Sequence, residues 1–140
     1  MSPRAARTFG AAHLVTAALV GFGVFGCLPG RWAPVDSVAA VVALLDAAAG
    51  VGLLRGASWA ERVARAASGV SLAVGLLLVT GLAVTASWLS GVYGPVGAGG
   101  AVILALVAAL ALPYLVAVPC VELVWLARGD DPAGRGSGEG

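Results

Sequence analysis

Four long apolar runs occupy most of this 140-residue chain. They cover about residues 10–28, 37–54, 62–90 and 98–127, and each has about the ~20 residues that an α-helix needs to cross a ~30 Å hydrocarbon core. Only 11% of the residues are charged, whereas soluble domains carry about 25%. We therefore predict an all-α integral membrane protein in which residues 1–128 form four transmembrane helices, packed as an up-down bundle.

The arginines indicate how such a bundle is oriented. Seven of the eight flank the runs on one side: Arg4, Arg7, Arg55, Arg62, Arg65, Arg128 and Arg135. Arg31 alone lies on the other side. Because positive residues collect in cytoplasmic loops, we predict that both termini and the middle loop are cytoplasmic, in a bacterial-type inner (plasma) membrane. The glycine-rich polar segment 129–140 is predicted to be a disordered cytoplasmic tail.

Prolines predict where the helices turn or bend. Gly94 and Pro95 are expected to reverse the chain between the third and fourth spans. Pro113 and Pro119 lie inside the fourth apolar run, and each removes a backbone N–H donor. We therefore expect a kink or local unwinding in the fourth helix.

The segment GVGLLRGASWAERVARAAS, residues 50–68, joins the second and third spans. Ser58 and Glu61 have the S-x-x-E spacing of a capping box, which predicts that the third helix begins near Trp59. The segment resembles a pattern found in small bacterial four-span membrane proteins, where a Gly-Leu-rich span ends in an arginine and a Trp-Ala pair opens the next. This resemblance implies a topology but no activity. Small multidrug transporters also have four spans, but they place their essential glutamate in the first, where this chain has none.

One candidate polar site contains the carboxylate in the second span. Counting from the span ends places Asp46, Thr80 and Tyr114 at a similar depth near the membrane midplane. An intramembrane carboxylate that alternates between protonated and paired states would make this a proton or cation site. The structural alternative is an aspartate that hydrogen-bonds neighbouring helices or pairs across an oligomer interface.

A second candidate lies nearer the cytoplasmic side. His13 on the first span and Glu122 on the fourth should lie at similar depth, where they would form an ion pair or a proton relay if the helices touch. The simpler alternative is that each side chain reaches separately toward the membrane interface.

The absence of several motifs from the sequence excludes classes of chemistry. There is no lysine for a Schiff base, one histidine where a bis-histidine haem needs two, and no Cys-x-x-Cys. We predict no catalytic, cofactor-binding or metal-binding residues and no enzymatic activity. The identity of any bound cofactor, lipid or pigment is left open, and a net charge of +1 gives no reason to expect nucleic acid binding.

Small residues on the second span favour close helix contacts. Ala39, Ala43 and Ala47 recur every four residues, and Ala48 and Gly52 have the same spacing. The sequence therefore favours a non-catalytic accessory, scaffold or interaction subunit that associates with itself or with other membrane subunits in the lipid bilayer. The alternative is a small proton- or cation-coupled transporter or channel that works as a homo-oligomer through Asp46.

Overall fold

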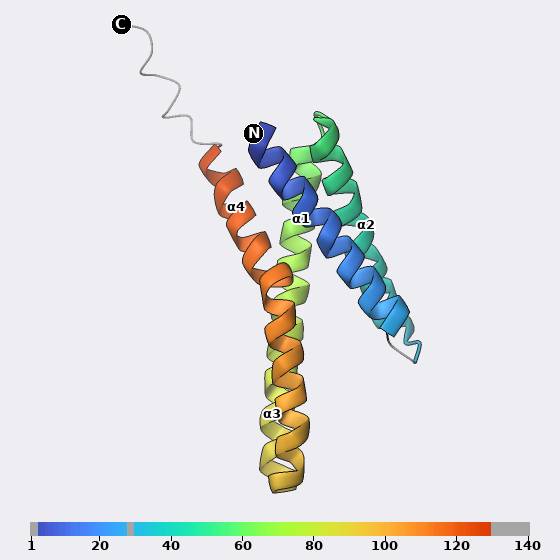
Figure 1. Cartoon of the computed structure of the whole chain (residues 1–140), viewed down its shortest axis with the longest axis vertical. Helices are drawn as coiled ribbons and strands as arrows, with labels where there is room; N and C mark the ends of the chain where they lie inside the picture. Colours follow the sequence, from blue (N-terminus) through green and yellow to red (C-terminus); the bar gives the residue numbers. More distant parts are fainter. Residues whose placement is uncertain (1–2, 28–29, 130–140) are drawn as a thin grey trace, which may run out of the picture.

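The computed structural model describes residues 3–27 and 30–129, and in these residues the chain is almost entirely helical, without strands. The elements in chain order are α1 (Pro3–Phe22), the π-helical η1 (Gly23–Cys27), α2 (Ala33–Arg55), α3 (Ala60–Leu112), the π-helical η2 (Pro113–Ala117) and α4 (Val118–Gly129). Figure 1 shows these helices running lengthwise through an elongated molecule. The predicted tail at 129–140 lies, after Gly129, outside the described residues.

Three helical stretches are long and apolar enough to cross a membrane: Pro3–Cys27, Ala33–Arg55 and Ala60–Arg128. The last contains 69 residues, about three times the ~20 that one crossing needs. An all-helical protein with apolar helices of membrane-spanning length is therefore confirmed.

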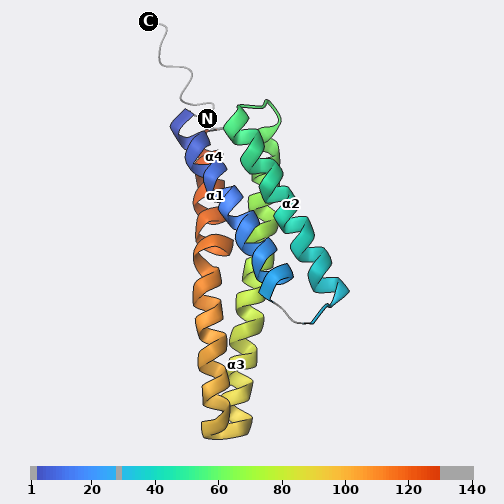
Figure 2. The same cartoon turned by 45° about the vertical axis from the view of Figure 1, so that its right-hand side comes forward.

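Helix α3 breaks sharply at Gly94, where φ is 56° and ψ is −133°. A positive φ is readily available to glycine, which has no Cβ. On either side of this residue the helix forms two limbs, and both views show the second limb returning alongside the first (Figures 1 and 2). The predicted turn at Gly94 and Pro95 is thus confirmed at the first of these residues.

The predicted disturbance in the last apolar run is also present. Helix η2 begins at Pro113, and the N–H of Val118 donates to the carbonyl of Pro113, five residues earlier. Pro113 has no N–H to bond the carbonyl of Ala109, so the regular i→i−4 pattern is interrupted where this wider turn begins. Gly75 on the first limb of α3 lies against η2 so closely that a Cβ there would be 2.6 Å from the carbonyl oxygen of Leu115.

Helices α1 and α2 form a second close pair. A Cβ added to Gly50 would lie 2.8 Å from the carbonyl oxygen of Gly10, so the two backbones touch because both positions are glycine. Next to this contact, Ala49 and Leu53 of α2 pack against alanines of α3 to form the apolar core. Small side chains are thus used within the chain to bring α1, α2 and α3 together.

Helix α2 ends at Arg55 and is capped by Gly56, which has a φ of 66° and a ψ of 31°. The N–H groups of Gly56 and Ala57 donate to the carbonyls of Leu53 and Gly52, closing the helix with a left-handed glycine cap. Helix α3 then begins at Ala60 with Trp59 at the N-cap position, close to the predicted start.

The N-cap of α3 lies one residue after Ser58, the residue that the capping-box spacing predicts for it. Trp59 is the N-cap residue and makes no side-chain capping hydrogen bond. Ser58 therefore lies one residue outside the position from which its hydroxyl would cap the helix.

The start of α1, the connection between α2 and α3 and the end of α4 all lie at one end of the molecule (Figure 1). We call this the arginine end, because most of the arginines named above lie in or beside these segments. The segment where α3 reverses direction lies at the opposite end, which we call the turn end (Figure 1).

Candidate functional site: a buried carboxylate–histidine–carboxylate cluster

Asp46 faces inward because it lies on the packed face of α2. The buried side chains of this helix recur at intervals of three and four residues: Ala39, Val42, Asp46, Ala49 and Leu53. Such spacing places side chains on one stripe of an α-helix. Packing of the apolar residues on this stripe therefore carries the carboxylate into the protein, where it is 2% exposed.

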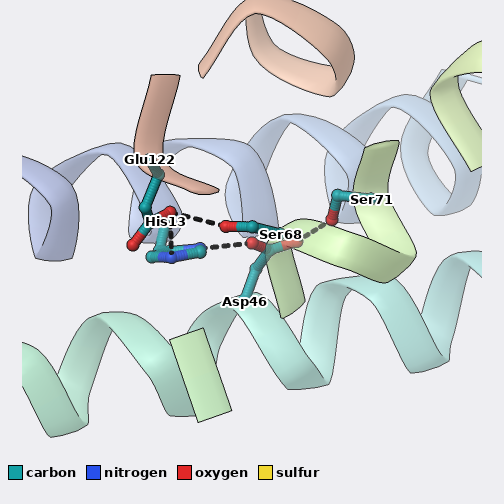
Figure 3. Close-up of polar contacts among 5 residues, drawn as sticks. All are labelled: His13, Asp46, Ser68, Ser71 and Glu122. Atoms are coloured by element: carbon teal, nitrogen blue, oxygen red, sulfur yellow. Dashed lines mark hydrogen bonds and ion pairs between the residues drawn. The ribbon is translucent and has the colours of Figure 1, made fainter. Parts of the chain in front are cut away.

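Both oxygens of Asp46 contact other helices. Oδ1 lies 2.5 Å from Nδ1 of His13 on α1, and Oδ2 accepts a 2.9 Å hydrogen bond from Oγ of Ser71 on α3. Figure 3 shows the imidazole and the serine approaching the carboxylate from different helices. Asp46 therefore links α2 to α1 and to the first limb of α3.

Glu122 on α4 contacts the other side of the same histidine. Its Oε2 accepts a 2.6 Å hydrogen bond from Oγ of Ser68 and lies 2.9 Å from Nε2 of His13, within ion-pair distance (Figure 3). Nε2 is not aligned with this oxygen as a hydrogen-bond donor would be, so the contact is an ion pair by distance alone. The Oε1 atom of Glu122 is buried and has no hydrogen-bond partner among the described residues.

Together these five side chains form what we call the polar cluster: His13, Asp46, Ser68, Ser71 and Glu122. None is more than 4% exposed. All four α-helices contribute at least one of them. Removing charged groups from water costs several kcal/mol per ion unless they are well paired, so the cluster carries a large energetic cost as well as a stabilising role.

The cluster lies toward the arginine end. Asp46 is nine residues before Arg55 and Glu122 is six before Arg128, which correspond to about 14 Å and about 9 Å along their helices. Phe9 and Trp125 lie about one helical turn nearer the arginine end, with ring centroids 5.7 Å apart. This aromatic pair therefore lies between the His13–Glu122 contact and the arginine end.

The structure brings His13 and Glu122 together, but it does not group Asp46 with Thr80 and Tyr114. Asp46 instead contacts the histidine and Ser71. Thr80 is exposed and Tyr114 is half-buried.

The prediction counted depth from the span ends, whereas the first limb of α3 extends well beyond α2. Before Gly94 the first limb of α3 runs for 34 residues, or about 51 Å, so its midpoint lies far from the arginine end. Thr80 is twenty residues into this limb, about 30 Å from its start, whereas Asp46 lies only about 14 Å from the end of α2.

The two serines were not identified as site residues from the sequence. A signal was available, because Ser68 and Ser71 are three residues apart and therefore share a helix face. This face also carries Ala64, Ala67 and Gly75, all of which are buried.

The short contact between His13 and Asp46 requires a hydrogen. It must lie between Nδ1 and the carboxylate, because two lone pairs would otherwise face each other. A second hydrogen at Nε2 would make the ring an imidazolium between two carboxyl groups. The cluster thus has two acidic side chains for one basic side chain, and its net charge is −1 when the ring is an imidazolium and both carboxyl groups are ionised.

The cluster can therefore exchange a proton or attract a cation. Among residues 3–27 and 30–129, no group of three His, Cys, Asp or Glu side chains has an arrangement suited to a metal ion. Of the carboxylate oxygens, three already face a hydroxyl or imidazole donor, and Glu122 Oε1 does not.

A scan against protein-family models found no match, and searches of curated proteins and of solved structures found none either.

Proposed function

We propose that the chain crosses the inner membrane four times, with α1, α2 and the two limbs beside Gly94 as the spans. The lengths and apolar character of the helical stretches support this, since the 69-residue stretch exceeds the need of a single crossing. The gathering of the arginine-bearing segments at one end of the molecule favours a cytoplasmic location for that end (Figure 1).

Within this topology, the protein functions as a small ion-coupled transporter or channel, in which a proton or cation binds at the polar cluster. The observation that carries this proposal is the burial of Asp46, His13 and Glu122 in mutual contact between helices that are long and apolar enough to cross a membrane. Ionisable groups are costly inside a membrane and mark ion pathways and proton relays. The proposed activity involves no catalysis, and the complete pathway is formed in a homo-oligomer.

Proteoliposomes containing the purified protein test this function. A potassium diffusion potential, negative inside, would be imposed, and proton entry would be followed with an enclosed pH-sensitive dye. Sodium ion entry would be measured under the same potential, and potassium ion entry in separate vesicles with an inward potassium gradient and no ionophore. We expect flux above that of empty vesicles, and loss of at least about nine-tenths of it in Asp46→Asn, because the cluster then has one carboxylate fewer.

The matched control is Thr80→Val, which changes an exposed polar residue at a different depth. It should retain the wild-type flux. Wild-type vesicles that conduct neither protons nor sodium or potassium ions would overturn the proposal, provided the protein is folded and correctly inserted.

The sequence-based expectation of an accessory or scaffold subunit is kept as the second candidate. The observation that favours it is the open space beside glycines of α3: a Cβ at Gly69 or Gly81 would meet nothing within 4 Å. Gly52, which suggested an association face, lies against Trp59 of the same chain. Its role in packing within the chain is one reason to rank transport first.

Native mass spectrometry of the protein extracted gently from its own membrane separates the two candidates. Stable association with other membrane polypeptides would favour the accessory role. A closed homo-oligomer without other subunits would favour transport.

A further inference from the structure

The two carboxylates of the polar cluster are not equivalent acceptors. Asp46 has a donor at each oxygen, namely His13 at Oδ1 and Ser71 at Oδ2. A proton added to either atom would share that oxygen with a donor already in short contact.

Glu122 is arranged differently, because its contacts converge on one oxygen. Oε2 faces both Ser68 and His13, whereas Oε1 is buried without a hydrogen-bond partner among the described residues. A proton can bind at Oε1 without breaking a contact. It also removes one negative charge from a site that is almost fully shielded from water, where an uncompensated charge is most costly.

The charged surroundings of Glu122 come from two helices. His13 on α1 faces it directly, and Asp46 on α2 acts on it through the same imidazole. The first limb of α3 contributes the uncharged Ser68 and Ser71. A hard metal cation would need several oxygen ligands, and three of the four carboxylate oxygens here already face a donor. A proton needs only one oxygen.

Resting on the ion-coupled function proposed above, we propose that the coupling ion is a proton, that Glu122 is the residue that takes it up and releases it, and that Asp46 and His13 form the fixed pair beside it. The supporting observation is the unequal hydrogen bonding of the two carboxylates.

Infrared difference spectroscopy of the reconstituted protein between acidic and alkaline buffer measures this directly. A protonated carboxyl group has a C=O stretching band that disappears on ionisation. Wild-type protein should show one such band from the membrane interior, and it should shift when the protein carries ¹³C-glutamate but not when it carries ¹³C-aspartate. The labels require no mutation, so this test does not depend on the folding of a variant.

Variants then locate the band within the sequence. We expect Glu122→Gln to lack it and Asp46→Asn to retain it. A band that shifts with ¹³C-aspartate and disappears in Asp46→Asn would overturn the assignment, as would the absence of any pH-dependent carboxyl band.

The serines provide a matched pair of milder changes. Ser68→Ala removes a donor from ionised Glu122 and should tighten proton binding about tenfold, moving the midpoint of the band by about one pH unit. Ser71→Ala removes a donor from Asp46 only and should move it much less. Equal shifts in both variants would argue against Glu122 as the site.

Two further measurements separate this inference from the transport function. Adding sodium or potassium ions at constant pH should leave the band unchanged, and its loss would show competition by a cation. A Glu122 band in protein that transports nothing would overturn the transport function but keep the proton site. Flux in a protein whose pH-dependent band belongs to Asp46 would keep the transport function but overturn Glu122 as the proton site.

Discussion

The hydroxyl side chains at the two ends of the first limb of α3 donate hydrogen bonds to different kinds of acceptor. Toward the arginine end, Ser68 and Ser71 donate to carboxylates on other helices. Toward the turn end, Thr85 and Ser87 donate to backbone carbonyls four residues earlier in their own helix. Their hydroxyls are therefore satisfied without any tertiary partner.

Burial differs in the same way. The first limb of α3 has buried residues from Ala60 to Gly75. Beyond this point it has none, and most of its large side chains are exposed, among them Leu77 at 75% and Trp88 at 64%. Figures 1 and 2 show the hairpin around Gly94 extending past the ends of α1 and α2. Lipid tails are as apolar as leucine, so exposed apolar side chains alone provide little reason for helices to associate in a membrane. The comparison indicates that polar pairing and close backbone contact determine where these helices meet.

The largest effect is expected from removing the residue at the centre of the polar cluster. His13→Ala would leave Asp46 and Glu122 buried without their shared partner, and breaking a buried pair typically costs about 3–5 kcal/mol. The free energy of unfolding in mixed micelles, titrated with denaturing detergent, measures this loss.

The control for this change is Asp36→Asn, which removes a partly exposed ion pair with Arg31, 3.8 Å away. Such a pair is worth at most about 1 kcal/mol. Similar losses in the two variants would show that the polar cluster does not stabilise the fold more than a surface pair does.

A somewhat smaller effect is expected from filling the contact between α3 and η2. A side chain at Gly75 would collide with the backbone of Leu115, so Gly75→Val should cost about 1–3 kcal/mol or more by overpacking. Gly81→Val changes the same residue type in the same helix, with nothing within 4 Å of the new Cβ. Thermal unfolding in detergent should show a lower midpoint for the first variant. Equal midpoints would contradict the close approach of the two segments.

The serines test the comparison at the level of single hydrogen bonds. Ser71→Ala should cost about 1–3 kcal/mol, because it removes a buried donor to a charged acceptor. Ser87→Ala should change stability by less than about 0.5 kcal/mol, since the exposed hydroxyl bonds only its own helix. The free energies of unfolding of the two variants, measured under one condition, test this difference. A larger loss in Ser87→Ala than in Ser71→Ala would contradict the conclusion that only the serines near the arginine end stabilise contacts between helices.

The smallest effect is expected at Thr80 and Tyr114, which the sequence grouped with Asp46 and which make none of its hydrogen bonds described above. Thr80→Val and Tyr114→Phe remove hydroxyls that do not reach the Asp46 carboxylate, whose oxygens face His13 and Ser71. Proton flux in proteoliposomes should stay within about twofold of wild type. A loss comparable to that of Asp46→Asn would show that the transport path extends from the cluster toward these residues.

Several features of the fold could be predicted because each depends on local chemistry. Apolar runs of sufficient length indicate membrane-spanning helices, Gly94 supplies a positive φ for the chain reversal, and Pro113 removes the donor that a regular helix would need. Each of these conclusions requires only the residue and its near neighbours in the chain.

The composition of the polar cluster could not be predicted in the same way. The sequence identified its ionisable members, His13, Asp46 and Glu122, but it divided them between two sites and omitted both serines. Residue counting measures position along one helix, whereas contact also depends on how far each helix extends, how it tilts and which face it turns inward.

The sequence by itself therefore determined the helical character of the chain, its apolar spans, its break at Gly94 and the presence of a few costly ionisable groups. Only the tertiary structure decided that His13 lies between Asp46 and Glu122, because the three residues are far apart along the chain. Asp46 follows His13 by 33 positions, and Glu122 follows Asp46 by 76. Close packing at Gly10, Gly50 and Gly75 makes that meeting possible. Such packing depends on contacts between distant segments, which no local pattern in the sequence specifies.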